Sequence, residues 1–312
     1  MLRFRLDKTA KTGQSISGRM CNLNCIWCHH DYFSHSDSHR CAISNEMFTE
    51  AVTRVLQATN VEEAIVRIAG DGEPTLVGCS ELVELIKRLH SIPQVKSIRL
   101  TTNGVLLKEM VGSLGEAGLD TVTVSLSSLD PDIYHFYTGS HHLHTVLDSI
   151  KVCLAVGIPT KVNVIYCRLN AREIDDFVLF AQQNEGMVLK FFDLIPAGQW
   201  GRRLHLPLDR LEARLASLAC HIREIRGAYS YREYQLKGGG VVQVKITQDN
   251  NCPNLACPVR SYCLEGCRSS LRIRLDGVLQ PCGVRIDNAI DIFAPTTTSA
   301  RIREAVKSGG KL

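Results

Sequence analysis

The sequence has no long apolar run, since no stretch approaches the 18 or so consecutive apolar residues that a membrane-spanning helix needs. Its opening residues, MLRFRLDKTAKTG, carry too many charges for the apolar region of a secretory signal peptide. Charge of one sign is also scarce, because 36 basic residues nearly balance 32 acidic ones. The resulting net charge of +4 is too mild to indicate nucleic-acid binding. We therefore expect a cytoplasmic protein without membrane or nucleic-acid partners.

Cysteine is the residue that the chain has in excess, with 13 in 312 residues. Disulfide frameworks are typical of short exported chains, which this sequence does not resemble. Five isolated cysteines are expected to be small buried hydrophobic residues: Cys41, Cys79, Cys153, Cys167 and Cys220. The other eight form two clusters, Cys21, Cys25 and Cys28 near the start and Cys252, Cys257, Cys263, Cys267 and Cys282 near the end. Clustered thiols in a cytosolic protein indicate metal.

Short apolar runs alternate with amphipathic helical patterns between about residues 14 and 218. The expected strands are SISGRM (15–20), AIVRIA (64–69), SIRLTT (97–102), TVTVSL (121–126), KVNVIY (161–166) and LKFFDLI (189–195). Between them, Leu82, Leu85, Ile86 and Leu89 share one helical face, and Asn170 with Glu173 resembles a capping box. Six β-then-α units in a row predict an α/β fold with a parallel sheet, either doubly wound or curled into a partial (β/α)6 TIM-like barrel.

The pattern changes after about residue 225, where the alternation of strands and helices stops. YREYQLKGGGVVQVKI (231–246) predicts two strands around three glycines, and LRIRLDGVLQPC (271–282) predicts a hairpin with Asp276 and Gly277 at its turn. We therefore predict a barrel over residues 1–225 and a small cysteine-rich domain over residues 226–312. No internal repeat is found.

The first cysteine cluster, CNLNCIWC, has the spacing C-x3-C-x2-C and is called the cysteine loop below (residues 21–28). A structural zinc site and an ordinary [4Fe–4S] site both take four protein ligands. Three thiolates can also carry a [4Fe–4S] cube that has one iron open to a small molecule. A zinc site in a non-enzymatic interaction module is the alternative, and the brown colour of an iron–sulfur protein would separate the two.

Three further motifs fall where predicted strands end: GDGEPTL after the second, TTNG after the third and VSLSSLD after the fourth. A glycine-rich turn exposes backbone to a ligand, and a carboxylate suits an ammonium group. Ligands of a parallel barrel lie at the carboxyl ends of its strands, so these motifs should converge on one face. The residues singled out here are Gly70, Gly72, Glu73, Thr101, Asn103 and Ser125.

The cysteine loop together with these strand-end motifs resembles the radical S-adenosylmethionine (SAM) superfamily. The resemblance implies that Cys21, Cys25 and Cys28 are catalytic ligands of a [4Fe–4S] cluster whose open iron binds SAM. It also implies that the reduced cluster cleaves SAM, and that the 5′-deoxyadenosyl radical takes a hydrogen from the substrate. The six strand-end residues would then contact SAM, and Trp27 would pack near its adenine.

Beyond this core, TTNG, VSLSSLDPDIYHFYTG, KVNVIY, FFDLIP and LRIRLDGVLQPC resemble the GTP 3′,8-cyclase family, which starts molybdopterin synthesis. This resemblance implies a second [4Fe–4S] cluster on the C-terminal cysteines, and a small nucleotide-like substrate contacted by Lys161 and Asn163. A reductant such as flavodoxin or ferredoxin would supply electrons. We add Arg272 and Arg274 as candidate anion contacts, because arginine suits phosphate or carboxylate. Both share one face of a strand, which could equally lie in solvent.

The resemblance has departures on the substrate side. Cys263, Cys267 and Cys282 have the spacing C-x3-C-x14-C, where the family has C-x2-C-x13-C. We expect Cys252 or Cys257 to supply a fourth ligand and close the second cluster. Two alternatives for the function stay open: a paralogue acting on a nucleoside or sugar, of the cytosylglucuronate decarboxylase kind, and a peptide- or protein-modifying enzyme.

Overall fold

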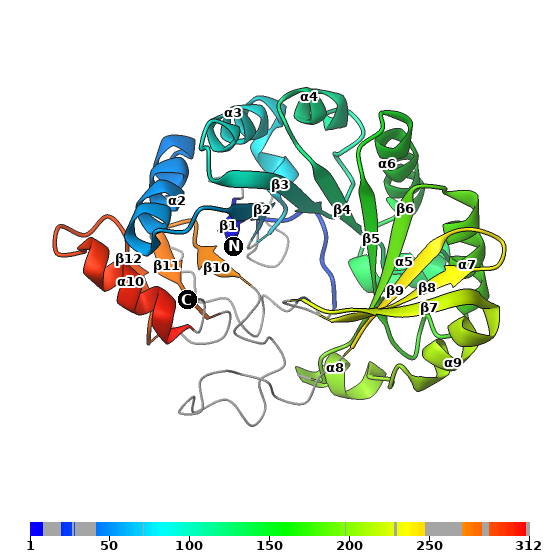
Figure 1. Cartoon of the computed structure of the whole chain (residues 1–312). Helices are drawn as coiled ribbons and strands as arrows, with labels where there is room; N and C mark the ends of the chain where they lie inside the picture. Colours follow the sequence, from blue (N-terminus) through cyan, green and yellow to red (C-terminus); the bar gives the residue numbers. More distant parts are fainter. Residues whose placement is uncertain are drawn as a thin grey trace.

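The computed structural model describes residues 1–8, 20–26, 28, 42–70, 72–196, 198–227, 230–246, 270–282 and 287–309. The strands of this part of the chain form a 12-stranded sheet with the order β12-β11-β10-β1-β2-β3-β4-β5-β6-β9-β8-β7. Figure 1 shows the sheet curved into an open arc with helices along its outer side. The expected partial TIM-like barrel is confirmed. Within the described residues, no helix has the length and apolar character needed to cross a membrane.

The central strands run parallel to one another: β10 (Leu271–Ile273), β1 (Leu2–Asp7), β2 (Ala64–Ala69), β3 (Val95–Thr102), β4 (Thr121–Ser125), β5 (Thr160–Tyr166), β6 (Met187–Asp193) and β9 (Val241–Lys245). Antiparallel strands extend both edges: β11 (Val278–Gln280), β12 (Ile290–Asp291), β8 (Tyr231–Leu236) and β7 (Ala219–Ile225). The helices are α2 (Asn45–Thr59), η1 (Pro74–Val77), α3 (Cys79–His90), α4 (Val111–Glu116), α5 (Pro131–Thr138), α6 (Leu143–Ala155), α7 (Ile174–Gln183), α8 (Gly198–Leu204), α9 (Asp209–Leu218) and α10 (Ser299–Ser308).

Alternation along each strand sorts apolar side chains from polar ones. In β5, Thr160, Val162, Val164 and Tyr166 are buried, while the residues between them are only partly buried. Successive side chains of a strand point to opposite faces, so β5 turns its apolar face to the helices and its polar face to the inside of the arc. The helical face expected in α3 is confirmed, because Leu82, Leu85, Ile86 and Leu89 are all fully buried.

The first strand of the sheet is β1, which the sequence analysis missed. Its sequence LRFRLD alternates buried Leu2, Phe4 and Leu6 with arginines, and it pairs with both β2 and β10. Of the strand expected at 15–20, only Met20 lies within the described residues, and it makes an isolated parallel bridge to Gly72. The cysteine loop therefore follows β1 at a distance rather than directly.

The sheet continues across the predicted domain boundary. β8 and β9 confirm the two strands expected around the glycines, and β9 pairs with β6 of the barrel. The expected hairpin is also confirmed as β10 and β11, with Gly277 at φ +81° in its turn. Because these strands extend the barrel sheet at both of its edges, residue 225 does not mark a break in the sheet. The division into two domains stays a prediction.

The expected capping box at α7 is wrong. The carboxylate of Glu173 makes no cap bond and accepts hydrogen bonds from the Ser128 hydroxyl and the Leu129 backbone N–H, both at 2.7 Å. The amide of Asn170 donates to the Ser127 carbonyl at 3.0 Å. These two side chains tie the loop after β5 to the loop after β4 instead of capping a helix.

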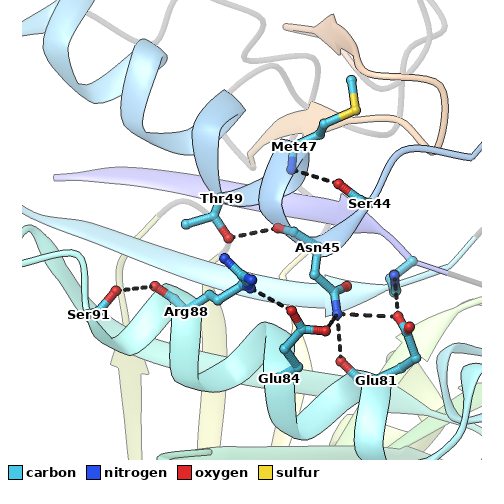
Figure 2. Close-up of polar contacts among 9 residues, drawn as sticks. Ser44, Asn45, Met47, Thr49, Glu81, Glu84, Arg88 and Ser91 are labelled. Atoms are coloured by element: carbon cyan, nitrogen blue, oxygen red, sulfur yellow. Dashed lines mark hydrogen bonds and ion pairs between the residues drawn. The ribbon is translucent and has the colours of Figure 1, made fainter.

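Polar contacts also fix the start of α2, as Figure 2 shows. Ser44 caps α2, because its hydroxyl accepts a hydrogen bond from the Met47 backbone N–H at 3.2 Å. The amide of Asn45 donates to the Glu81 carbonyl and to the Glu84 carboxylate of α3, both at 3.0 Å. The start of α2 is thereby joined to α3.

Candidate active site

The cysteine loop lies at the carboxyl end of the parallel strands. The backbone N–H of Glu73, just beyond β2, donates to the Met20 carbonyl at 2.9 Å. The Asn103 side chain, just beyond β3, donates to the Asn22 carboxamide at 2.7 Å. The loop and the ends of β2 and β3 therefore meet on one face, as the sequence analysis expected.

The last turn of α5 supports the loop from another side. Its carbonyls at Tyr137 and Thr138 accept hydrogen bonds from the Ile26 and Asn24 backbone N–H groups, at 3.1 and 2.8 Å. These two amides flank Cys25 in the chain. The open carbonyls at the end of a helix thus hold the middle of the cysteine loop.

Cys21, Cys25 and Cys28 are partly buried, and none of the three is in a disulfide. The Asn103 amide points to the Cys21 sulfur at 3.9 Å, as does the Leu23 backbone N–H at 3.4 Å. Burial raises the pKa of the Cys21 thiol. A coordinated metal would offset this effect, because it stabilises the thiolate form.

The three thiols do not converge on one point. Among the described residues, no three His, Cys, Asp or Glu side chains converge where a single ion could sit. A zinc site brings all its sulfur ligands to about 2.3 Å from one ion. In a [4Fe–4S] cube each thiolate binds a different iron, so the sulfurs stand apart.

Glu73 holds two strand ends together. Its carboxylate is 2% exposed and accepts hydrogen bonds from the Thr75 backbone N–H (3.0 Å) and hydroxyl (2.7 Å). It also accepts from the Thr102 hydroxyl (2.5 Å) and the Asn103 backbone N–H (2.7 Å). Burial raises the pKa of this carboxyl. The Glu73 carboxylate thus already accepts four hydrogen bonds from the protein. Its expected contact with the amino group of SAM stays a prediction.

Glu73→Gln is expected to lower the free energy of unfolding. The substitution keeps the size of the side chain but places an NH2 group among four donors. An unsatisfied buried donor costs about 1–3 kcal/mol, which chemical denaturation under anaerobic conditions can measure. Glu116→Gln, on the exposed end of α4, is the matched control and should leave stability unchanged. Equal stabilities of the Glu73 variant and the control would contradict the bracing role.

The other described residues that were predicted to contact SAM also lie at the carboxyl ends of the strands β2, β3 and β4. At Gly70 an added Cβ would stand 2.8 Å from the Gly72 carbonyl oxygen, so this turn requires glycine there. Thr101 on β3 is partly buried, and Ser125 at the end of β4 is exposed. Trp27 lies outside the described residues.

Of the five cysteines predicted to hold a second cluster, one lies within the described residues. Cys282 is buried and follows β11 of the hairpin. Its four predicted partners lie outside the described residues: Cys252, Cys257, Cys263 and Cys267. The second cluster therefore stays a prediction.

The inner face of the sheet carries an inner cation cluster, which we define as Arg67 on β2, Arg99 on β3, Lys161 on β5 and Lys190 on β6. Burial lowers the pKa of Lys161, and Arg99 and Arg67 lower it further. Burial, with repulsion from the other three cations, lowers the pKa of Lys190 to about 7. Across the described part of the chain, neither lysine forms an ion pair with an acidic side chain. Such a group of cations suits an anionic ligand.

Only Lys161 of this cluster was expected. The other three are basic residues at inward positions of the strands AIVRIA, SIRLTT and LKFFDLI. Each is a single charged residue inside an otherwise apolar run. The run was assigned as a strand, and the charge within it was not considered as a possible ligand contact. Lys190 also has an aromatic neighbour, since its amine stands 3.6 Å from the centroid of the Tyr231 ring on β8. Beside it in the register is Asn163, whose buried Oδ1 has no hydrogen-bond partner within the described residues.

Arg272 and Arg274 do not lie in solvent, because their exposed fractions are 7% and 9%. The Arg272 guanidinium donates to Asp7, and Arg274 donates to Asp276 at 3.1 Å. Both predicted arginines thus have acidic partners, in contrast to Lys161. Their direct contact with substrate stays a prediction.

The model of the radical SAM superfamily matches residues 15–181, more than half of the chain. The chain therefore belongs to the radical SAM superfamily and is an enzyme of that class. It is 33% identical over 283 residues to "Probable GTP 3′,8-cyclase" of Methanothermobacter thermautotrophicus, which covers 89% of this chain and 85% of the relative. It is 34% identical over 277 residues to the protein of the same name from Sulfolobus acidocaldarius, covering 87% and 80%.

A solved structure described as native anSMEcpe with bound AdoMet has a similar fold. The TM-score is 0.65, covering 100% of this chain and 85% of that chain, at 16% sequence identity. At this identity the likeness concerns the fold alone. The resemblance to GTP 3′,8-cyclase therefore comes from the sequence relatives.

Proposed function

We propose that this enzyme cleaves SAM at a [4Fe–4S] cluster held by Cys21, Cys25 and Cys28 and takes hydrogen from a small anionic, nucleotide-like substrate, similar to GTP 3′,8-cyclase. When bound, the cluster supplies the electron that breaks the sulfonium bond of SAM. The protein holds three thiols on one loop, braced by Asn103 and α5. The backbone of the Gly70–Gly72 turn, with Thr101 and Ser125, lies on the same face and would bind SAM beside it.

The inner cation cluster is the observation that carries the substrate class. Its four cations lie on four parallel strands and face the inside of the arc, and burial together with mutual repulsion lowers the pKa of its two lysines. The phosphates of a nucleotide would supply negative charge to these lysines, and lysine and arginine both bind phosphate well. The nearby Oδ1 of Asn163 would accept a hydrogen bond from an N–H or O–H of the same substrate.

The second part of the proposal concerns the C-terminal cysteines. Cys263, Cys267 and Cys282 would hold a second [4Fe–4S] cluster, with Cys252 or Cys257 as the fourth ligand. In support, the hairpin that precedes Cys282 pairs with β1 through β10, next to the barrel wall. An electron donor such as flavodoxin or ferredoxin would reduce the enzyme.

Anaerobic incubation with SAM and dithionite, with and without GTP, tests the function. We expect 5′-deoxyadenosine to form, faster with GTP than with guanosine, because only GTP offers phosphates to the cation cluster. GTP should be converted to a new product in the same reaction. Stimulation by a nucleoside, sugar or peptide but not by GTP would support one of the alternatives. No 5′-deoxyadenosine from protein that contains its iron would contradict the radical SAM assignment itself.

A further inference from the structure

Tyr134 on α5 has a buried hydroxyl group without a hydrogen-bond partner. The side chain is 1% exposed, and within the described residues its oxygen makes no hydrogen bond. The Thr138 hydroxyl is near enough to act on the pKa of Tyr134, but it donates its proton to the Tyr134 carbonyl. Buried polar groups in folded proteins almost always have a partner, so an exception requires an explanation. A bound group in the active enzyme that serves as the hydrogen-bond partner of the Tyr134 hydroxyl would explain it.

The position of Tyr134 indicates which group this is. It lies one turn before Thr138, whose hydroxyl donates to the Tyr134 carbonyl at 2.8 Å. The same end of α5 holds the cysteine loop through the amides that flank Cys25. Cys25 packs against the hydrophobic core that contains Tyr134, and after burial its charge is the largest influence that raises the pKa of the Tyr134 hydroxyl.

Tyr137 shows that the other buried phenol of α5 is satisfied. Its hydroxyl lies 2.6 Å from the sulfur of Cys167, which directly follows β5. The two tyrosines share a helix and are both buried, yet only Tyr134 combines an unpaired hydroxyl with a neighbour in the cysteine loop. The absence of a partner is therefore specific to Tyr134 within this helix.

We infer that the Tyr134 hydroxyl donates a hydrogen bond to a sulfur of the cluster held by Cys25 and thereby raises the reduction potential of that cluster. The inference rests on the cluster assigned in the proposed function. A phenol is protonated at neutral pH and donates one proton, and the sulfurs of an iron–sulfur cluster are acceptors. Hydrogen bonds to these sulfurs stabilise the more negative, reduced state, so they set the potential.

Tyr134→Phe removes only the oxygen, and redox titration followed by electron paramagnetic resonance measures the result. The cluster of the cysteine loop is identified by the change in its signal when SAM is added. We expect the ratio of reduced to oxidised cluster at a fixed potential to fall about tenfold, which is a shift of about 59 mV to more negative potential for one electron. Tyr137→Phe is the matched control and should leave the potential unchanged.

Stability of the cluster-free protein provides a second readout. Without the cluster the hydroxyl has nothing to bind, so Tyr134→Phe should be as stable as the wild type or more stable. An unchanged potential, or equal shifts in both tyrosine variants, would overturn the inference. So would a destabilised cluster-free Tyr134→Phe, because the hydroxyl would then have a partner in the protein. Loss of the SAM-dependent signal in the wild type would instead count against the proposed function.

Discussion

Replacing Cys21, Cys25 and Cys28 together with alanine is expected to remove one cluster, about four irons per chain, and to abolish SAM cleavage. The reason is that all three ligands lie on one loop, and α5 and Asn103 position that loop rather than bind metal in its place. Iron analysis of anaerobically purified protein and the yield of 5′-deoxyadenosine measure the two effects.

Cys220→Ala is the control for this experiment. The expectation that Cys220 is buried is wrong, because the residue is exposed on the edge strand β7. Its thiol contacts only the Gln235 carbonyl, at 3.3 Å, among the contacts described. Its replacement should change neither the iron content nor the cleavage rate. SAM cleavage by the triple variant at the wild-type rate would falsify the assignment of these cysteines.

Lys161→Met and Lys190→Met are expected to weaken the binding of GTP. Methionine keeps the length of the side chain and removes its charge. A contact between a charged donor and a phosphate contributes about 1.5–3 kcal/mol, so each affinity should fall roughly 10- to 150-fold. Calorimetric titration measures the affinity, with Lys151→Met on the exposed side of α6 as the control. Equal losses for GTP and guanosine would count against contact with the phosphates.

The same titration on either side of pH 7 isolates Lys190. Because the pKa of Lys190 is lowered to about 7, its amine is charged below this pH and increasingly neutral above it in the free enzyme. The wild type should therefore lose affinity for the anion as pH rises through 7. The Lys190→Met variant should bind weakly throughout and show no loss from this source. The ionisation of the ligand itself is common to both proteins, so parallel pH profiles would contradict the assignment.

The sequence was sufficient for the features that depend on local pattern. The strands from 64 to 195 were predicted because strict alternation has one interpretation, and the hairpin at Asp276 and Gly277 because the turn chemistry is distinctive. The same alternation is present in LRFRLD, but the charges of this segment were used only to argue against a signal peptide, and a strand was not predicted there. Its partner β10 lies far along the chain, so the parallel pairing between the two strands cannot be predicted from the local sequence.

Polar residues with several possible partners were predicted less well. Asn170 and Glu173 fit a capping box by spacing, yet both side chains bind the loop after β4, which only the tertiary fold brings near. Arg272 of β10 could not be placed in solvent or inside without knowledge of its partner Asp7. Lys190, Arg67 and Arg99 looked like isolated charges until the register put them on one face.

The place of β1 has a consequence for how the chain folds during synthesis. β1 is made before both of its partners, can pair with β2 soon afterwards, and keeps its other edge open until β10, about 270 residues further along the chain, emerges. An open edge of a nearly complete sheet invites pairing with other chains, so this interval is the one in which the nascent protein is most exposed to aggregation. Until β10 arrives, the buried Asp7 also lacks Arg272, one of its two cationic partners, and pairs with Arg5 alone.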